Sequence, residues 1–180
     1  LTYDHVRVLN ENGFNAFVLH NKKGFKPEWL GSRLEGVPVI YLEDDKLDIK
    51  LEDFFFIPEG YPQLMENLQA QGAPCKKIVF CQNWYYVLNA LPAGTLWNNY
   101  GIHDCMSVSH MQSSYLKAIM PFLRIKNVVG SIDNTVFTPP EKMEYKKPIV
   151  AFKASRDGIK GYNVIKTFYS VFPQFRWIQF

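Results

Sequence analysis

Short apolar runs alternate with polar stretches along the chain, and each run has the length of a β-strand. The runs with the length and composition of strands lie at residues 14–19, 37–42, 53–58, 77–81, 104–108, 127–130, 149–152 and 175–180. Two of them, 53–58 and 77–81, are apolar at successive positions, which predicts strands covered on both faces of a sheet. Pro38 places the run at 37–42 at a sheet edge, because proline lacks the N–H that a central strand donates.

Helix signals fill several of the polar stretches between these runs. Residues 1–12 have a helical pattern, and Gly13 follows as a residue suited to the left-handed conformation that ends a helix. Pro62 suits the first turn of a second helix that runs to about residue 71, and Gly72 suits its exit.

A third helix is expected at residues 109–121. Ser109 and Gln112 have the spacing of a capping box, in which each side chain bonds the backbone of the other residue. Apolar residues at helical period predict the buried stripe of this helix, and they are Met111, Tyr115, Leu116 and Ile119.

Strands that alternate with amphipathic helices predict βαβ units, so we expect an α/β fold with mostly parallel sheets and helices on both faces. The pattern predicts a Rossmann-like domain at residues 1–138, a linker of proline and charge at 139–148, and the start of a second α/β domain at 149–180. The first element is a helix and the last is a strand with nothing after it. We therefore expect a fragment whose first strand is missing and whose second domain is truncated.

Composition narrows the function classes. The 180 residues are 47% hydrophobic and 21% charged, which excludes a disordered, collagen-like or coiled-coil protein. The 20 Lys and Arg against 17 Asp and Glu give a formal charge of +3, and without a long basic run this balance disfavours a dedicated nucleic-acid binder. No run approaches 18 apolar residues and no basic-then-apolar leader is present, so these residues show neither a membrane span nor a signal peptide.

The cysteines and histidines give little sign of metal or disulfide chemistry. Three cysteines without a CxxC pair argue for a reducing compartment, and Cys81 and Cys105 lie in apolar runs that predict burial. The four histidines show no metal-binding spacing, so we expect no metal site. His103 and Asp104 are adjacent and remain a candidate pair of base and orienting group.

The most informative candidate is a basic turn after the strand at 149–152. Lys153, Arg156 and Lys160 accompany two glycines at a turn that leads into a helix, and ligands of parallel sheets bind beyond the carboxyl ends of strands. Cationic side chains beside backbone N–H groups suit a diphosphate. A solvated basic turn is the equally weighted alternative.

Polar and aromatic side chains also follow two strands of the first domain. Glu59 follows the run at 53–58, while Gln82, Asn83 and Trp84 follow the run at 77–81. The amides can bind a polar ligand, and the aromatic cluster of Trp84, Tyr85 and Tyr86 can stack on a sugar or another planar face. Packing of these aromatic residues between helix and sheet is the stronger alternative.

Residues 127–139, with the sequence NVVGSIDNTVFTP, resemble the passage of group 1 glycosyltransferases of the GT-B fold that runs from a hydrophobic strand through N-G-I/V-D to F-x-P. Ser107 to Ser109 before a helix looks like the strand-to-helix step of that family. Residues 149–161 resemble its element of strand, basic loop and K-G. The specific part of the resemblance covers about residues 104–165, and Gln82–Asn83 stands where many members place His-Asp.

The resemblance implies two Rossmann-like domains and metal-independent transfer of a sugar from a nucleotide-diphosphate sugar to a glycan, lipid-linked or small-molecule acceptor, with retention typical of the family. It implies no cofactor, places Lys153, Arg156 and Lys160 at the donor diphosphate, and places Glu59, Gln82, Asn83 and Trp84 at the acceptor side. No catalytic residue is assigned. We expect a cytoplasmic location, with peripheral contact at the inner face of a membrane left open, and an inactive fragment.

Two other functions stay open at this point. A non-catalytic α/β module could hold an anionic ligand in the same cleft, and a GT-B sugar-nucleotide epimerase would bind a nucleotide sugar without transferring it to an acceptor. Fold alone does not separate these functions.

Overall fold

The computed structural model describes residues 2–43, 47–128, 130, 138, 149–152 and 161–179. The chain divides into two compact units, Leu1–Gly130 and Ser131–Phe180, with the change near the end of the predicted first domain. The linker predicted at residues 139–148 and the basic turn after the strand at 149–152 lie outside the described residues.

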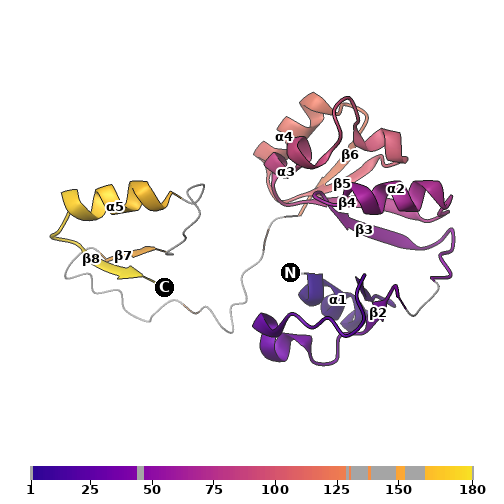
Figure 1. Cartoon of the computed structure of the whole chain (residues 1–180), viewed down its shortest axis with the longest axis horizontal. Helices are drawn as coiled ribbons and strands as arrows, with labels where there is room; N and C mark the ends of the chain where they lie inside the picture. The colour runs from indigo at the N-terminus through magenta and orange to yellow at the C-terminus, as the bar shows by residue number, and fades with distance from the viewer. Residues whose placement is uncertain are drawn as a thin grey trace. The chain divides into compact units, whose positions relative to one another are not determined.

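The first unit is built around a four-stranded parallel sheet with the order β3-β4-β5-β6 (Figure 1). Its strands are β3 (Phe54–Pro58), β4 (Lys76–Cys81), β5 (Asp104–Ser107) and β6 (Arg124–Asn127). Because neighbouring strands are parallel, all four carboxyl ends lie along one edge of the sheet. The predicted α/β class with mostly parallel sheets is confirmed.

Three helices cover one face of this sheet (Figure 1), namely α2 (Pro62–Ala70), α3 (Trp84–Ala90) and α4 (His110–Ile119). The core between them and the sheet is continuous and includes the fully buried Ile57, Val79, Leu116 and Met120. Strand residues whose side chains face this core alternate with residues that face away from it, as the pleat requires.

A smaller part of the first unit comes from the beginning of the chain. Helix α1 (Thr2–Glu11) precedes a two-stranded parallel sheet of β1 (Val18–His20) and β2 (Val39–Tyr41), with the 3₁₀ segment η1 (Glu28–Leu34) between the strands. Gly13 has a φ of 84° after α1, which confirms the predicted helix exit. His5 of α1 contacts the ring of Phe80 in β4 at a centroid distance of 5.4 Å.

The predicted coverage of β3 on both faces is wrong. Phe54 and Phe56 are exposed, whereas Ile57 on the opposite face is fully buried under the helices. The reason is positional, because β3 is the outer strand of its sheet and the helices α2 to α4 pack on the other side.

Two further expectations need correction. The strand predicted at 127–130 begins earlier, since β6 is Arg124–Asn127, a polar edge strand that no apolar run marks. Met111 is exposed rather than part of the buried stripe of α4, while Leu116 on the same helix is fully buried. Gln112 in the same turn is buried, so the buried side of α4 runs through Gln112 and Leu116, and Met111 lies outside it.

The second unit shows a βαβ arrangement. Strands β7 (Ile149–Phe152) and β8 (Arg176–Gln179) pair in parallel, and α5 (Tyr162–Val171) connects them. Both strands lie at predicted apolar runs, and the described part of this unit is a single βαβ arrangement.

Candidate functional site

A hollow of about 590 Å³ lies at the carboxyl ends of β3 and β4. This is the edge at which ligands of open parallel sheets bind, and the volume is within the range of small-molecule sites. The residues that line it come from the segments after the two strands and from the start of α3; they are Pro58, Glu59, Gly60, Tyr61, Gln82, Asn83 and Tyr86.

Glu59 holds the two sides of the hollow together. Its side chain is almost completely buried, and Oε1 accepts hydrogen bonds from the backbone N–H of Asn83 at 2.7 Å and of Gln82 at 3.2 Å. A buried carboxylate needs such donors, because desolvation without them is costly. The bonds fix the position of the carboxylate and of the turn that follows β4.

Asn83 begins helix α3. Its backbone is extended, with φ −141° and ψ 112°, and its side-chain Oδ1 accepts a hydrogen bond from the N–H of Tyr85 at 3.0 Å. This is the geometry of an N-cap, which satisfies one of the free N–H groups of the first turn. The Asn83 side-chain oxygen therefore has a structural partner, whereas no hydrogen bond among the described residues uses its Nδ2 group, a donor at the wall of the hollow. Gln82 lies beside it and is exposed.

The aromatic residues that follow β4 do not all line the hollow. Tyr86 lines the hollow together with Tyr61, the residue that precedes α2. Trp84 instead packs against Tyr115 of α4, with ring centroids 5.1 Å apart. Of the four residues predicted for the acceptor side, the structure thus brings Glu59, Gln82 and Asn83 together and places Trp84 outside the hollow.

A second polar group lies farther along the same sheet edge, at the ends of β5 and β6. Asn127 Oδ1 accepts from the hydroxyl of Ser113 at 2.6 Å and lies 2.9 Å from that of Ser107, and Asn127 Nδ2 lies 2.6 Å from His110 Nδ1. An amide nitrogen only donates, so in this arrangement His110 Nδ1 accepts and the ring N–H is the one on Nε2. The His110 ring is thereby fixed with an N–H that does not serve this network.

Gln112 joins helix α4 to the sheet. This buried side chain accepts from the backbone N–H of Val108 at 3.0 Å through Oε1, and its Nε2 contacts Cys81 Sγ at 3.3 Å. Its own backbone N–H donates to Ser109 Oγ at 3.2 Å, the first half of the predicted capping box. The second half differs, because the Gln112 side chain bonds Val108 instead of the cap residue.

His103 and Asp104 do not form a pair of base and orienting group. His103 lies edge-on to Phe122, and Asp104 binds Arg124 through two hydrogen bonds of 2.9 and 2.7 Å, with Lys76 3.7 Å away. The bonds from Arg124 lower the pKa of Asp104. Asp104 opens β5, so this ion pair lies at the sheet edge opposite to the hollow.

The cysteines are free and buried. Burial raises the pKa of all three thiols, that of Cys105 to about 12, so Cys75, Cys81 and Cys105 are unreactive thiols at neutral pH. Within the described ranges, no group of three His, Cys, Asp or Glu side chains could hold a metal ion. None of the helices there combines the length and hydropathy needed to cross a bilayer.

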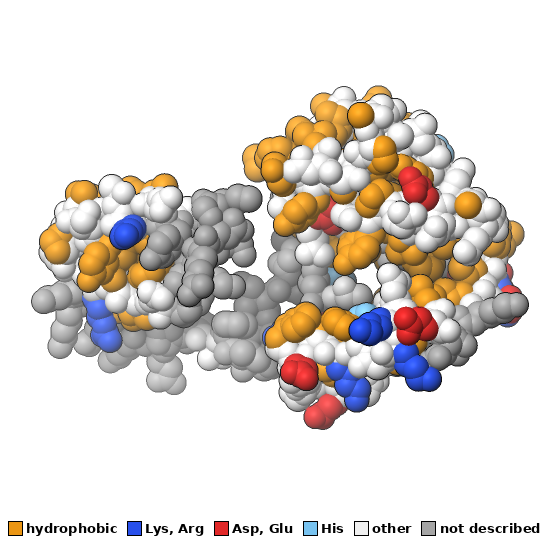
Figure 2. All heavy atoms as spheres, viewed as in Figure 1, with side chains coloured by type: hydrophobic (Ala, Val, Ile, Leu, Met, Phe, Trp, Pro, Cys, Tyr) orange, Lys and Arg blue, Asp and Glu red, His pale blue; other side chains and the backbone are white. Residues whose placement is uncertain are grey.

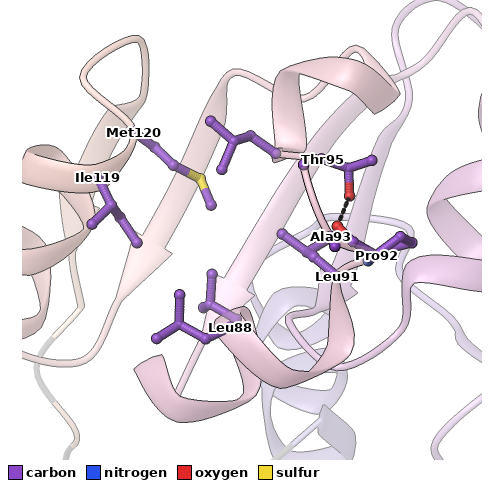
Figure 3. Close-up of a pocket in the computed structure, with 10 residues that line it drawn as sticks. Leu88, Leu91, Pro92, Ala93, Thr95, Ile119 and Met120 are labelled. Carbon is purple, nitrogen blue, oxygen red and sulfur yellow. Dashed lines mark hydrogen bonds between the residues drawn. The ribbon is translucent and has the colours of Figure 1, made fainter.

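A smaller hollow of about 200 Å³ lies between the C-terminal parts of α3 and α4 (Figure 3). Leu88, Leu91, Ile119 and Met120 point into it, and the hydroxyl of Thr95 is already donated to the carbonyl of Pro92 at 2.7 Å. It offers little to orient a polar ligand, and so the hollow at the strand ends is the better candidate site.

The three cations predicted to bind a diphosphate, Lys153, Arg156 and Lys160, lie outside the described residues. In the sequence, these three cations lie between the carboxyl end of β7 and the start of α5. The group around Asn127 was not predicted to belong to a site, whereas Tyr86 belongs to the aromatic cluster that the sequence offered for stacking on a sugar.

Comparisons of the chain with models of known protein families, with curated proteins and with solved structures give no match.

Proposed function

We propose that the chain is the acceptor-side domain and the start of the donor-side domain of a glycosyltransferase of the GT-B fold. The observation that carries the proposal is the hollow at the carboxyl ends of β3 and β4, in a parallel sheet followed along the chain by a second βαβ unit. The sequence resemblance over about residues 104–165 supports it independently of the hollow.

The donor would bind at the basic segment after β7. Lys153, Arg156 and Lys160 lie in sequence between that strand and α5, where ligands of parallel sheets bind. Guanidinium and ammonium groups bind phosphate oxygens strongly, and Arg156 can do so through two N–H groups. Such cations would stabilise the negative charge that develops on the leaving diphosphate, so the reaction needs no bound metal.

Transfer forms a bond between an acceptor oxygen and the anomeric carbon of the sugar, and it breaks the bond from that carbon to the diphosphate oxygen. The electron pair of the broken bond leaves with the nucleoside diphosphate. In transfer with retention, the departing phosphate oxygen takes the proton of the acceptor hydroxyl. Glu59, Gln82 and Asn83 would bind the acceptor in the hollow of the first unit.

The test is a transfer assay on the complete gene product. The protein is incubated with labelled UDP-, GDP- and ADP-sugars in the presence of EDTA, and release of the nucleoside diphosphate is followed with and without a mixture of glycan acceptors. The proposal predicts release with one class of nucleotide sugar, increased by acceptor. Binding of a nucleotide sugar with conversion to an isomeric sugar would indicate an epimerase, and absence of both reactions would favour the binding module.

A further inference from the structure

The hollow at the ends of β3 and β4 has a distinctive chemical character. Its lining offers one carboxylate, two side-chain amides and two phenols, and none of its lining residues is Lys, Arg or His. Residues 82–102, which include its α3 wall, contain no charged residue and no histidine at all. The lining therefore offers hydrogen-bonding groups to a polar ligand but no cation to an anionic one.

The carboxylate of Glu59 is held ready for such a ligand. Oε1 is taken by the N–H groups of Gln82 and Asn83, and no hydrogen bond within the described part of the chain occupies Oε2. The residue is only 5% exposed, and the two hydrogen bonds to Oε1 fix the orientation of its carboxylate. A carboxylate accepts hydrogen bonds only, which makes Oε2 a fixed acceptor for hydroxyl donors.

Two aromatic rings line the hollow beside these polar side chains. Tyr61 and Tyr86 line the hollow and are both exposed, Tyr86 to 52%. Such rings provide an apolar face beside a hydroxyl group, a combination suited to ligands that are apolar on one side and polar at the edge. A pyranose ring has this property, with C–H groups on its faces and hydroxyl groups around its rim.

We propose that the hollow binds an uncharged pyranose ring, which would be the end of a glycan acceptor. Glu59 Oε2 accepts hydrogen bonds from its hydroxyl groups, Asn83 Nδ2 and the Gln82 amide bind neighbouring hydroxyl groups, and Tyr61 and Tyr86 pack on its faces. That this sugar belongs to an acceptor rests on the proposed function, whereas binding of a pyranose in the hollow does not.

The same observations weigh against two other occupants. An anionic ligand would meet the negative Glu59 without a cation among the lining residues. A membrane surface would suit the hydrophobic side chains that are visible over α2, α3 and α4, where charged side chains are few (Figure 2), but residues 82–102 lack the basic side chains that attract anionic lipids. Both occupants remain outcomes of the experiment.

The experiment measures binding of neutral methyl glycosides of glucose, galactose and mannose to the complete gene product by saturation-transfer NMR and calorimetry. Glucuronate and vesicles of phosphatidylglycerol serve as the anionic and membrane probes. We expect at least one neutral glycoside to bind, with glucuronate about tenfold weaker and no retention on vesicles.

The variants are chosen to separate binding from folding. Glu59→Gln retains an oxygen for the N–H groups of Gln82 and Asn83 but replaces the acceptor Oε2 with a donor, and Tyr86→Ala removes a ring. Each should weaken binding about tenfold or more. Tyr85→Ala is the matched control, because Tyr85 is a neighbouring tyrosine of similar exposure, 47%, that does not line the hollow.

The proposal is overturned if no neutral glycoside binds the folded protein, if glucuronate or vesicles bind in preference, or if Tyr86→Ala binds as tightly as Tyr85→Ala. Titration of the same samples with nucleotide sugars separates the two proposals. Glycoside binding without nucleotide binding contradicts the transferase and leaves the sugar site, whereas the reverse result contradicts the sugar site alone.

Discussion

Asn127 directs its amide nitrogen at the imidazole of His110, with Nδ2 2.6 Å from Nδ1. The amide oxygen of Asn127 accepts a hydrogen bond from the Ser113 hydroxyl on its other side. The relationship joins the end of β6 to the first residue of α4. It fixes which nitrogen of His110 carries the proton at the sheet edge where ligands are expected.

The first prediction concerns this tautomer. At neutral pH, His110 should be present mainly with its proton on Nε2, and Asn127→Ala should shift the population towards that of a free histidine, because the donor to Nδ1 is lost. Two-bond ¹H–¹⁵N correlation spectra of the imidazole ring measure the tautomer directly. Asn89→Ala, at an exposed position of α3, is the control and should leave the spectrum unchanged. A wild-type ring protonated on Nδ1 would contradict the assignment.

The second prediction concerns acid stability. The hydrogen bonds from Arg124 lower the pKa of Asp104 in the folded state, so the ionised carboxylate stabilises the fold above its unfolded pKa of about 3.9. That contribution is lost as the pH falls through the lower folded pKa. The difference in free energy of unfolding between wild type and Asp104→Asn should therefore be present at pH 7 and shrink below about pH 4.

Urea unfolding at a series of pH values tests this expectation, with Asp48→Asn as an exposed control. The difference should also be smaller at high salt, because Arg124 is largely exposed. A difference that grows as the pH falls would show that the Asp104 pKa is raised rather than lowered.

The third prediction concerns the two faces of α4. Leu116 is fully buried against the sheet, so Leu116→Ala should lower the free energy of unfolding by about 2–5 kcal/mol. Met111→Ala on the same helix should change it by no more than about 0.5 kcal/mol, because Met111 is exposed. Chemical denaturation of both variants measures the difference. Equal losses would mean that Met111 belongs to the buried stripe after all.

The fourth prediction concerns the donor site of the proposed transferase. The double variant Arg156→Ala with Lys160→Ala should weaken binding of the nucleotide sugar by about 100-fold or more, since two charge-assisted contacts to the diphosphate are lost. Lys166→Ala with Arg176→Ala removes the same charge from exposed positions of the second unit and is the matched control. Equal affinity of the two double variants would remove Arg156 and Lys160 from the diphosphate site.

Much of the fold was predictable because burial leaves a local signature in the sequence. The strands β4 and β7 and the helices α1 and α2 follow from apolar runs and from Gly or Pro at their ends. Strand β6 was misplaced because it lies at an edge, where Arg124 and Lys126 are exposed and no apolar run marks it. The exposure of Phe54 was not predicted for a related reason. An apolar run does not indicate whether helices cover one face of its strand or both.

The site was predictable only in part, for a physical reason. That Glu59, Gln82 and Asn83 follow strands is visible in the sequence, and parallel pairing of β3 with β4 brings them together. The hydrogen bonds from the turn after β4 to Glu59 span 23 and 24 residues, and no local spacing predicts them. The separation of Trp84 from Tyr86 likewise depends on how α3 packs on α4, which the sequence pattern does not determine.

The measurement that tests the central claim most directly is calorimetric titration of the complete, folded gene product with nucleoside diphosphates and their sugars in the presence of EDTA. We expect one nucleoside diphosphate and its sugar to bind without metal and to raise the thermal midpoint, because a ligand that binds only the native state stabilises it. Absence of binding across the panel would contradict the glycosyltransferase assignment.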